Sequence, residues 1–286
     1  MHSRHSLIFL HISKTGGMSF SPIIVRQFLQ EAVYQINGSL RVSAEELCSL
    51  SGERKANIQC LYGHMPFGLH TCLSQPSVYV TLLRNPVERI ISAYYYSLRR
   101  PEWGFHQQIV ERNLSLHDFV VDKVSAELHN EQTRMLSGSD EPVTAIDALD
   151  RAKKNLDAHF VVAGLTERFD EFLLLCRMLL GWRNVFYQKK NINRHRPQLG
   201  EISPRTISVI EKHNSLDLEL YDVVRQRFDQ LILEYTTLKS ELHQFQSLNR
   251  LYSFAGNLLD LPVNLIHDAQ TAITQARMRK QRFSAP

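Results

Sequence analysis

The feature that most constrains the fold is an apolar run followed at once by a lysine and two glycines, in LIFLHISKTGGMSF at residues 7–20. The run over residues 6–12 is short and ends in a glycine-containing turn, as a buried parallel strand does. Residues 19–36 then place apolar side chains at helical spacing, with Pro22 in the first turn. The stretch predicts strand, loop and helix, the first half of a βαβ unit.

The same pattern recurs further along the chain. Strands are predicted within 58–65, over 78–83 and over 160–164, and helices follow the last two, with Thr166 expected to cap the later one. Strands that alternate with helices predict an α/β fold with a mainly parallel sheet. The motifs HISKTGG, YGHM and LLRNP all fall at predicted strand ends, where such sheets bind ligands, so we expect one shared site.

The chain from Ser203 onward reads as almost wholly helical, because apolar residues recur every three to four positions. This pattern favours a long helix packed on the sheet, and a homo-oligomer seam through the C-terminal helices is the alternative. We therefore divide the chain into a main domain at 1–240 and a C-terminal helical extension at 241–286. The tail QARMRKQRFSAP is expected to be a solvated end.

Charge and cysteine content set the broad class. The chain has 286 residues, a formal charge of +4 and a pI of about 8.9, which suits anionic ligands but does not indicate nucleic acid. The first apolar run is too short for a membrane span, so we predict a cytoplasmic protein unless a targeting segment is missing. No metal-site spacing is present, and four cysteines are predicted to be reduced thiols: Cys48, Cys60, Cys72 and Cys176.

The first motif predicts an anion site. A glycine-rich turn before a helix presents free backbone N–H groups, and Lys14 adds a positive charge. The nucleoside triphosphatase pattern places glycines before its lysine, whereas here both glycines follow Lys14, which disfavours that class. The alternative for this loop alone is a turn whose lysine faces solvent.

The second motif, LLRNPVERIISAYY, places Arg84 at a strand end and Ser92 two turns into the next helix. An arginine there suits planar, bidentate recognition of a phosphate. Taken alone, a local salt bridge at Arg84 and a packed Ser92 would explain the motif equally well.

Together the two motifs resemble the paired signatures of sulfotransferases that use 3′-phosphoadenylyl sulfate (PAPS), most closely the heparan sulfate and uronyl 2-O-sulfotransferases. YGH at 62–64 and the segments 152–180 and 189–195 look like later blocks of that family in the same order, so the resemblance covers roughly residues 6–235. It implies a P-loop NTPase-like parallel sheet flanked by helices. It also implies PAPS as co-substrate, adenosine 3′,5′-bisphosphate (PAP) as product, and no metal.

The resemblance also implies roles for individual residues. Lys14 would contact the bridging oxygen of the phosphosulfate, Arg84 and Ser92 the 3′-phosphate, and Arg194 would close over the nucleotide. The 5′-phosphate would be cradled by Thr15, Gly16, Gly17, Met18 and Ser19, with Met18 standing where the family usually has threonine.

His64 is the predicted general base. A histidine suits removal of a hydroxyl proton at neutral pH, and the family's element carries two histidines, of which the earlier is replaced here by Tyr62. Lys14 and the loop N–H groups would stabilise charge on the leaving phosphate. Tyr62, Asn130 and Arg134 are expected near the acceptor, the last two as part of HNEQTRMLSG, for which ordinary helix-surface polarity is the alternative.

The sequence thus predicts a sulfotransferase that acts on a hydroxyl, with a carbohydrate as the expected acceptor. A small-molecule, lipid or protein tyrosine acceptor is the alternative. A module that binds nucleotide without turnover is a further one, in which Met18 and Tyr62 would mark lost function. A nucleotide kinase is disfavoured, because no acidic strand end offers a Mg²⁺ site. Related eukaryotic enzymes are commonly Golgi-anchored, so a lumenal domain without its anchor is the alternative to a soluble, bacterial-type protein.

Overall fold

The computed structural model describes residues 5–36, 40–139, 146–189 and 196–259. Within these residues it contains one five-stranded sheet in the order β2-β3-β1-β4-β5, and every neighbouring pair is parallel. The strands are β1 (Ser6–Leu10), β2 (Val33–Ile36), β3 (Cys60–Gly63), β4 (Ser77–Leu83) and β5 (Phe160–Leu165). Because β1 lies in the middle and is buried throughout, the first predicted strand is the centre of the core.

Helices join the strands and continue beyond them. The first group is α1 (Gly17–Val25), α2 (Leu40–Ser49), α3 (Gly52–Ala56), α4 (Pro86–Ser97), α5 (His106–Glu111), α6 (Leu116–Val121), α7 (Glu131–Ser137) and α8 (Ile146–His159). The second group is α9 (Phe169–Leu180), α10 (Pro204–His213), α11 (Ser215–Glu234) and α12 (Leu238–Leu259). Short 3₁₀ turns are η1 (Gln30–Ala32), η2 (Leu69–Cys72), η3 (Ala126–Leu128), η4 (Thr166–Arg168) and η5 (Leu199–Glu201).

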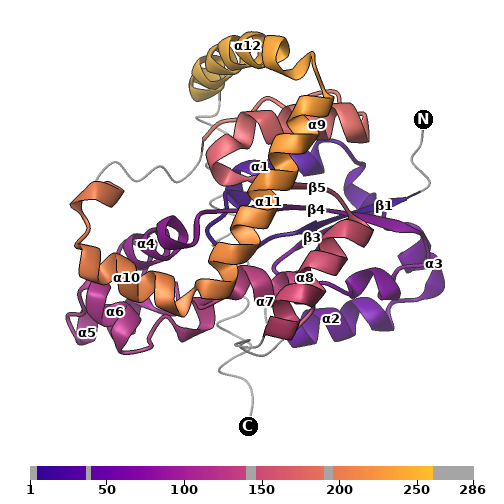
Figure 1. The fold of residues 1–286 in the computed structure, drawn as a ribbon. Coiled ribbons are helices and arrows are strands. Elements are labelled where there is room, and N and C mark those ends of the chain that lie inside the picture. The colour runs from indigo at the N-terminus through magenta and orange to yellow at the C-terminus, as the bar shows by residue number, and fades with distance from the viewer. Residues whose placement is uncertain (1–4, 37–39, 140–145, 190–195, 260–286) are drawn as a thin grey trace.

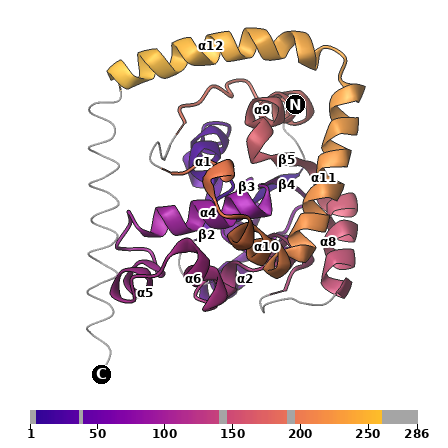
Figure 2. The same cartoon turned by 60° about the vertical axis from the view of Figure 1, so that its left-hand side comes forward.

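The sheet is covered on both faces. Figure 1 shows it nearly edge-on, with α1 and α9 above it and α2, α7 and α8 below. Such covering explains why its strands read as continuous apolar runs rather than alternating ones. The turned view in Figure 2 shows α12 across the top of the molecule, and Leu238 and Phe245 of this helix are buried.

A second, smaller core lies beside the sheet, formed by α4, α5, α6 and α10. Ile90, Phe119 and Ile210 are fully buried there, each from a different one of these helices. The helix α4 therefore connects the sheet to this smaller core, because its N-terminus follows β4 and its remaining turns pack against α5, α6 and α10. The smaller core thus lies beside any ligand that binds at the end of β4.

The structure confirms the α/β fold with a parallel sheet and the strands predicted within 58–65, over 78–83 and over 160–164. The helix predicted over 19–36 is wrong beyond residue 25, because Val33–Ile36 pairs with β3 as the edge strand β2. Thr166 does not cap α9, whose N-cap is Arg168. The Thr166 hydroxyl instead donates to the carbonyls of Thr15 and Leu83, at 2.8 and 2.9 Å, and so connects the segments that follow β1, β4 and β5.

Between residues 204 and 259, the end of the described chain, the C-terminal part is helical as predicted, but in three helices rather than one. Leu220, Val224 and Phe228 of α11 are buried, and this helix packs against β5. The division at residue 240 falls within the first turn of α12 and stays a prediction. In the described part of the chain, no helix combines the length and apolar character that crossing a membrane requires.

Two of the four cysteines are paired, which corrects the prediction of reduced thiols. Cys48 of α2 and Cys72 of η2 form a disulfide with their Cα atoms 4.9 Å apart, while Cys60 and Cys176 are free and buried. The pairing depends on α2 packing beside η2, which is a tertiary contact. Spacing in the sequence could not show it.

Candidate active site

A cavity of about 1260 Å³ lies where β1, β3, β4 and β5 end. The predicted site residues that line it are Lys14, Gly16, Gly17, Met18, Ser19, His64, Arg84, Ser92 and Arg134. The carboxyl ends of parallel strands lie at one edge of the sheet. Between β1 and β4 the chain connections lead to opposite sides of the sheet, and ligands commonly bind in the crevice that forms at such a point. The structure therefore brings the two motifs and His64 together as expected.

The β1–α1 loop is shaped by its glycines and by Lys14. Lys14 and Gly16 adopt left-handed backbone conformations, with φ of +63° and +89°. A Cβ on Gly17 would lie 2.0 Å from Nε2 of His11, so only glycine fits beneath that ring. Thr15 differs from the expectation, since it is fully buried and its hydroxyl donates to the carbonyl of Ile12 at 2.9 Å. Thr15 can therefore offer the cavity only its backbone.

Lys14 rests against aromatic rings. Its Nζ lies 3.3 Å from the ring centroid of Tyr96 and 4.8 Å from that of Trp103, which are cation–π distances. Desolvation, followed by the positive charges of Arg84, Arg99 and Arg100, lowers its pKa from 10.5 to about 7. Arg84 and Arg100 have the carboxylates of Glu88 and Glu102 within 3.4 and 3.5 Å, whereas Lys14 forms no ion pair with the residues that the structure describes, so an anion would stabilise its charge.

Arg84 is fixed through its backbone. Gln132 of α7 accepts from its N–H at 2.9 Å and donates to its carbonyl at 3.0 Å. The guanidinium points back to the first loop, where Nη1 donates to the carbonyl of Lys14 at 3.2 Å. At the start of α4, the Asn85 side chain caps the helix and Pro86 is its first residue. The two motifs are thus in direct contact.

Arg194 lies outside the described residues, but Arg196, two positions later, lines the cavity. Arg196 forms an ion pair with Glu88 of α4 and donates to the Glu88 carbonyl at 3.3 Å. Sequence reasoning missed Arg196. The available signal was its position in the same basic block, KKNINRHRP at 189–197.

His64 follows β3 and faces the cavity, stacked on His11 with ring centroids 4.1 Å apart. Desolvation lowers the pKa of both histidines, so both are neutral near pH 7. His11 was not singled out from the sequence. The available signal was its place directly after the first apolar run, and the structure shows that Leu10 pairs with Gly63, so the two histidines follow paired residues.

Tyr62 and Asn130 are not cavity-lining residues. The Tyr62 hydroxyl donates to Gln35 of β2 at 2.8 Å. Asn130 is buried, and its side-chain oxygen accepts from the N–H groups of Leu216 and Asp217 at the start of α11. Both side chains are occupied by structural contacts. Arg134, by contrast, lines the cavity as expected and donates to the carbonyl of Glu127 at 3.1 Å.

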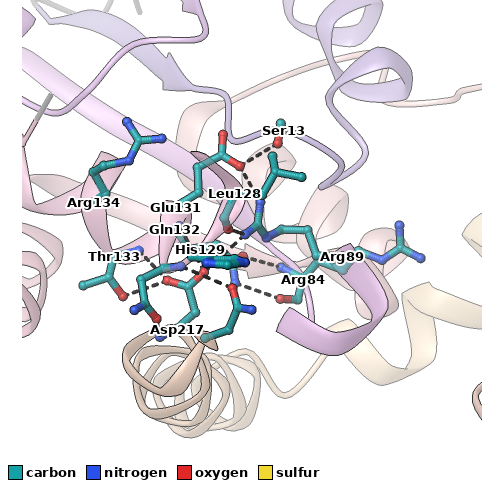
Figure 3. A network of polar contacts seen from close by, with 12 residues as sticks. Ser13, Arg84, Arg89, Leu128, His129, Glu131, Gln132, Thr133, Arg134 and Asp217 are labelled. Atoms are coloured by element: carbon teal, nitrogen blue, oxygen red, sulfur yellow. Dashed lines mark hydrogen bonds and ion pairs between the residues drawn. The ribbon is translucent and has the colours of Figure 1, made fainter. Parts of the chain in front are cut away.

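A buried set of charges lies below the cavity, and we call it the Arg89 junction: Arg89 of α4, Glu131 of α7 and Asp217 of α11. Arg89 is fully buried and pairs with Glu131 and, at 3.5 Å, with Asp217. Figure 3 shows Arg89 between these carboxylates, with Ser13 of the first loop reaching the same Glu131. The junction joins three helices that are far apart in the sequence.

No cluster of three or more His, Cys, Asp or Glu side chains in the described part of the chain is arranged to hold a metal ion. The cavity is lined by both basic and acidic side chains, and the basic residues Lys14 and Arg84 are the ones beside the glycine-rich turn. Fold and cavity together define the class: a P-loop-like α/β protein with an anion-attracting cavity at its strand ends.

The model of the sulfotransferase family matches residues 1–223, so the chain belongs to this family, whose members use PAPS as co-substrate. Three relatives are heparan-sulfate 6-O-sulfotransferases. The chain is 26% identical to type 2 of Gallus gallus over 83% of its own length and 70% of the relative's. It is also 26% identical to type 1 of Cricetulus griseus and of Homo sapiens, over 78% of its own length and 67% and 66% of theirs. These relatives are 6-O enzymes by name, whereas the sequence resemblance pointed to 2-O enzymes.

Proposed function

We propose that this chain transfers the sulfuryl group of PAPS to a hydroxyl of a carbohydrate. The observation that carries the proposal is the meeting of Lys14, Arg84 and His64 in one cavity, each from the end of a different strand. A cationic cradle and a neutral histidine side by side are what transfer from an anionic donor to an alcohol requires. The names of the relatives support a carbohydrate as the acceptor.

The residues divide into a donor side and an acceptor side. The first-turn N–H groups of α1, with Lys14 and Ser19, would hold the 5′-phosphosulfate, while Arg84 and Ser92 would hold the 3′-phosphate. PAPS, when bound, supplies a sulfuryl group on a phosphate leaving group. Lys14 would move from the aromatic rings to the bound anion. The negative charge of the anion would raise the pKa of Lys14 again, because it favours the ammonium form.

His64 would take the proton from the acceptor hydroxyl. Its low pKa in the free protein keeps the imidazole unprotonated at neutral pH, so it starts as a base. Arg134, with Tyr96 and Trp103, lines the same cavity and would contact the acceptor sugar. None of these roles calls for a metal ion, and the proposal includes none.

Transfer of ³⁵S from labelled PAPS tests the proposal. Purified protein is incubated with desulfated heparan sulfate, chondroitin, simple glycosides, a phenol and a tyrosine peptide, and the products are digested and separated. We expect label on a polysaccharide, and the labelled disaccharide reports whether the 6-O or the 2-O position is sulfated. Label only on the phenol or the peptide would replace the carbohydrate acceptor. PAP binding without any transfer would indicate a non-catalytic module.

We also propose a compartment and leave the oligomer as a prediction. The Cys48–Cys72 disulfide supports the lumenal alternative over the cytoplasmic one, because disulfides persist in oxidising compartments. The helix α12 exposes Leu251 and Phe254, which would suit a homo-oligomer through the C-terminal helices. Light scattering on the purified chain tests this, and a monomeric mass at micromolar concentration would contradict it.

A further inference from the structure

Glu131 is the one residue of the Arg89 junction that also lines the cavity. It is the first residue of α7, and α7 is fixed against α11 by reciprocal capping. Asn130 accepts from the first N–H groups of α11, and Asp217 accepts from the N–H groups of Gln132 and Thr133 at 3.2 and 2.8 Å. Glu131 is therefore held at the point where two helix N-termini cross.

The two carboxylate oxygens of Glu131 have different surroundings (Figure 3). Oε2 accepts from Ser13 Oγ at 2.6 Å and from the buried guanidinium of Arg89. Oε1 accepts no hydrogen bond from the residues that the structure describes. One oxygen thus anchors the residue that precedes Lys14, while the other has no partner within the described part of the chain. A carboxylate used only to neutralise Arg89 would not need either arrangement.

His64 is the ionisable group that Glu131 acts on across the cavity. Among the described residues, the groups that act on it come from three elements: His11 after β1, Lys14 in the following loop and Glu131 at the start of α7. Desolvation lowers the pKa of His64, the charge of Glu131 and a hydrogen bond with the His11 backbone raise it, and Lys14 lowers it. Glu131 is thus the carboxylate that favours a positive charge on His64.

We propose that Glu131 is a positioning residue for sulfuryl transfer, which fixes the Ser13–Lys14 loop and stabilises the imidazolium that forms at His64. In the reaction the acceptor O–H bond breaks and its proton passes to His64, while the acceptor oxygen bonds to sulfur. The bond between sulfur and the phosphate oxygen breaks, and its electron pair stays on that oxygen. Glu131 takes no proton. It offsets the charge created on His64 beside the cation of Lys14.

This inference rests on the proposed function only in stating that His64 becomes positively charged during sulfuryl transfer. Its first test therefore needs no measurement of activity. NMR titration of histidine-labelled protein, with the His64 signal assigned by loss in His64→Gln, compares the wild type with Glu131→Gln. We expect the pKa of His64 to fall by about 0.5–1 pH unit, because the negative charge of the Glu131 carboxylate across the cavity is lost. Glu219→Gln removes an exposed carboxylate from α11 and should leave the titration unchanged. An unchanged His64 titration in Glu131→Gln overturns the inference.

Two further variants separate the loop from the charge. Ser13→Ala removes the anchor and keeps the charge, so PAP affinity should fall about fivefold with the His64 titration intact. Glu131→Asp keeps a charge against Arg89, and therefore the fold, even if Glu131→Gln proves too unstable to study. It withdraws the carboxylate by one methylene, and the pKa of His64 should fall by less than in Glu131→Gln. A Glu131→Asp protein identical to the wild type in titration and in turnover would also overturn the inference.

Kinetics complete the test in an active wild type. Glu131→Gln should lower kcat by up to about tenfold per unit fall in the His64 pKa, with the KM for PAPS changed far less, and the acidic limb of the pH–rate profile, where His64 becomes protonated, should move to lower pH. Glu131→Asp should recover part of kcat. A uniform loss without movement of the limb would assign Glu131 a structural role only. Absence of transfer in the wild type would count against the proposed function and leave the titration result standing.

Discussion

The cavity and the Arg89 junction both gather charged side chains, but they treat the charge in opposite ways. In the cavity, Lys14 and its arginine neighbours repel one another, and Lys14 responds with a pKa lowered to about 7. In the junction, a fully buried arginine meets two carboxylates. The cavity is therefore suited to an added anion, whereas the arginine of the junction already has its counter-charges inside the protein.

The difference shows how binding and support are divided. Unpaired charge costs stability in the free protein and is recovered only with a ligand, so it belongs where a ligand enters. A buried charge that is already paired gains little from a ligand, but it fixes the relative positions of the elements that carry the pair. Removing one partner is costly, because it leaves the other charge buried without compensation. Glu131 and Gln132 connect the two regions, the first to Ser13 and the second to Arg84.

The largest expected effect is on the cavity side. His64→Ala should lower kcat by about 10²–10⁴-fold while PAP still binds, because the proton acceptor is lost and the nucleotide contacts remain. Steady-state rates with calorimetry measure both. His243→Ala, an exposed histidine on α12, is the matched control and should keep full activity. Turnover above about a tenth of wild type in His64→Ala would remove His64 as the base.

The junction should show its effect in stability. Arg89→Met leaves Glu131 and Asp217 as buried carboxylates without their partner, at a cost of about 3–5 kcal/mol in the free energy of unfolding. Urea unfolding measures it. Arg112→Met breaks an exposed ion pair with Asp122 and should cost at most about 1 kcal/mol. Equal losses in the two variants would contradict the contrast between paired buried charge and surface charge.

Gln132 tests the connection between the regions. Gln132→Leu leaves the N–H and carbonyl of Arg84 without their partner, which we expect to cost about 1–3 kcal/mol of stability and to weaken PAP binding. Gln132→Glu keeps an acceptor for the N–H but loses the donor, so it should fall between leucine and wild type. A Gln132→Leu protein with unchanged PAP affinity would show that Arg84 needs no such support.

The smallest effect concerns pH. Below about pH 7, Lys14 of the free protein is already protonated, so PAP binding needs no proton. Above that pH the free lysine is neutral and the bound anion requires its charge, so affinity should fall about tenfold per pH unit until the pKa in the complex is reached. Calorimetry in buffers of different ionisation enthalpy measures the proton uptake. Lys14→Met should bind more weakly and without this dependence. A wild-type affinity that stays constant between pH 7 and 8.5 would contradict the lowered pKa.

Most of the cavity could be predicted from the sequence, because its residues follow strands directly. Lys14, His64 and Arg84 come just after apolar runs, and parallel strands bring their ends to one edge whatever the details of packing. The resemblance to sulfotransferases added roles that spacing alone could not give. The motif could not show that the Thr15 side chain turns away from the cavity, because that orientation depends on its hydrogen bond to the carbonyl of Ile12.

The rest depends on contacts between distant segments. The Arg89 junction joins residues 89, 131 and 217, and nothing local at any of them signals the other two. Asn130 was expected near the acceptor as part of the block HNEQTRMLSG, yet it caps a helix that begins at Ser215. The strand β2 was read as helix because Val33 continues a helical spacing, and only its pairing with β3 decides otherwise.

Calorimetric titration with PAP, set against ATP with Mg²⁺, tests the central claim most directly. The account predicts micromolar binding of PAP, weakened at least tenfold in Arg84→Ala, and no measurable heat with ATP and Mg²⁺. Preference for ATP with Mg²⁺, or PAP binding that Arg84→Ala leaves unchanged, would contradict a nucleotide site built from the two strand-end motifs.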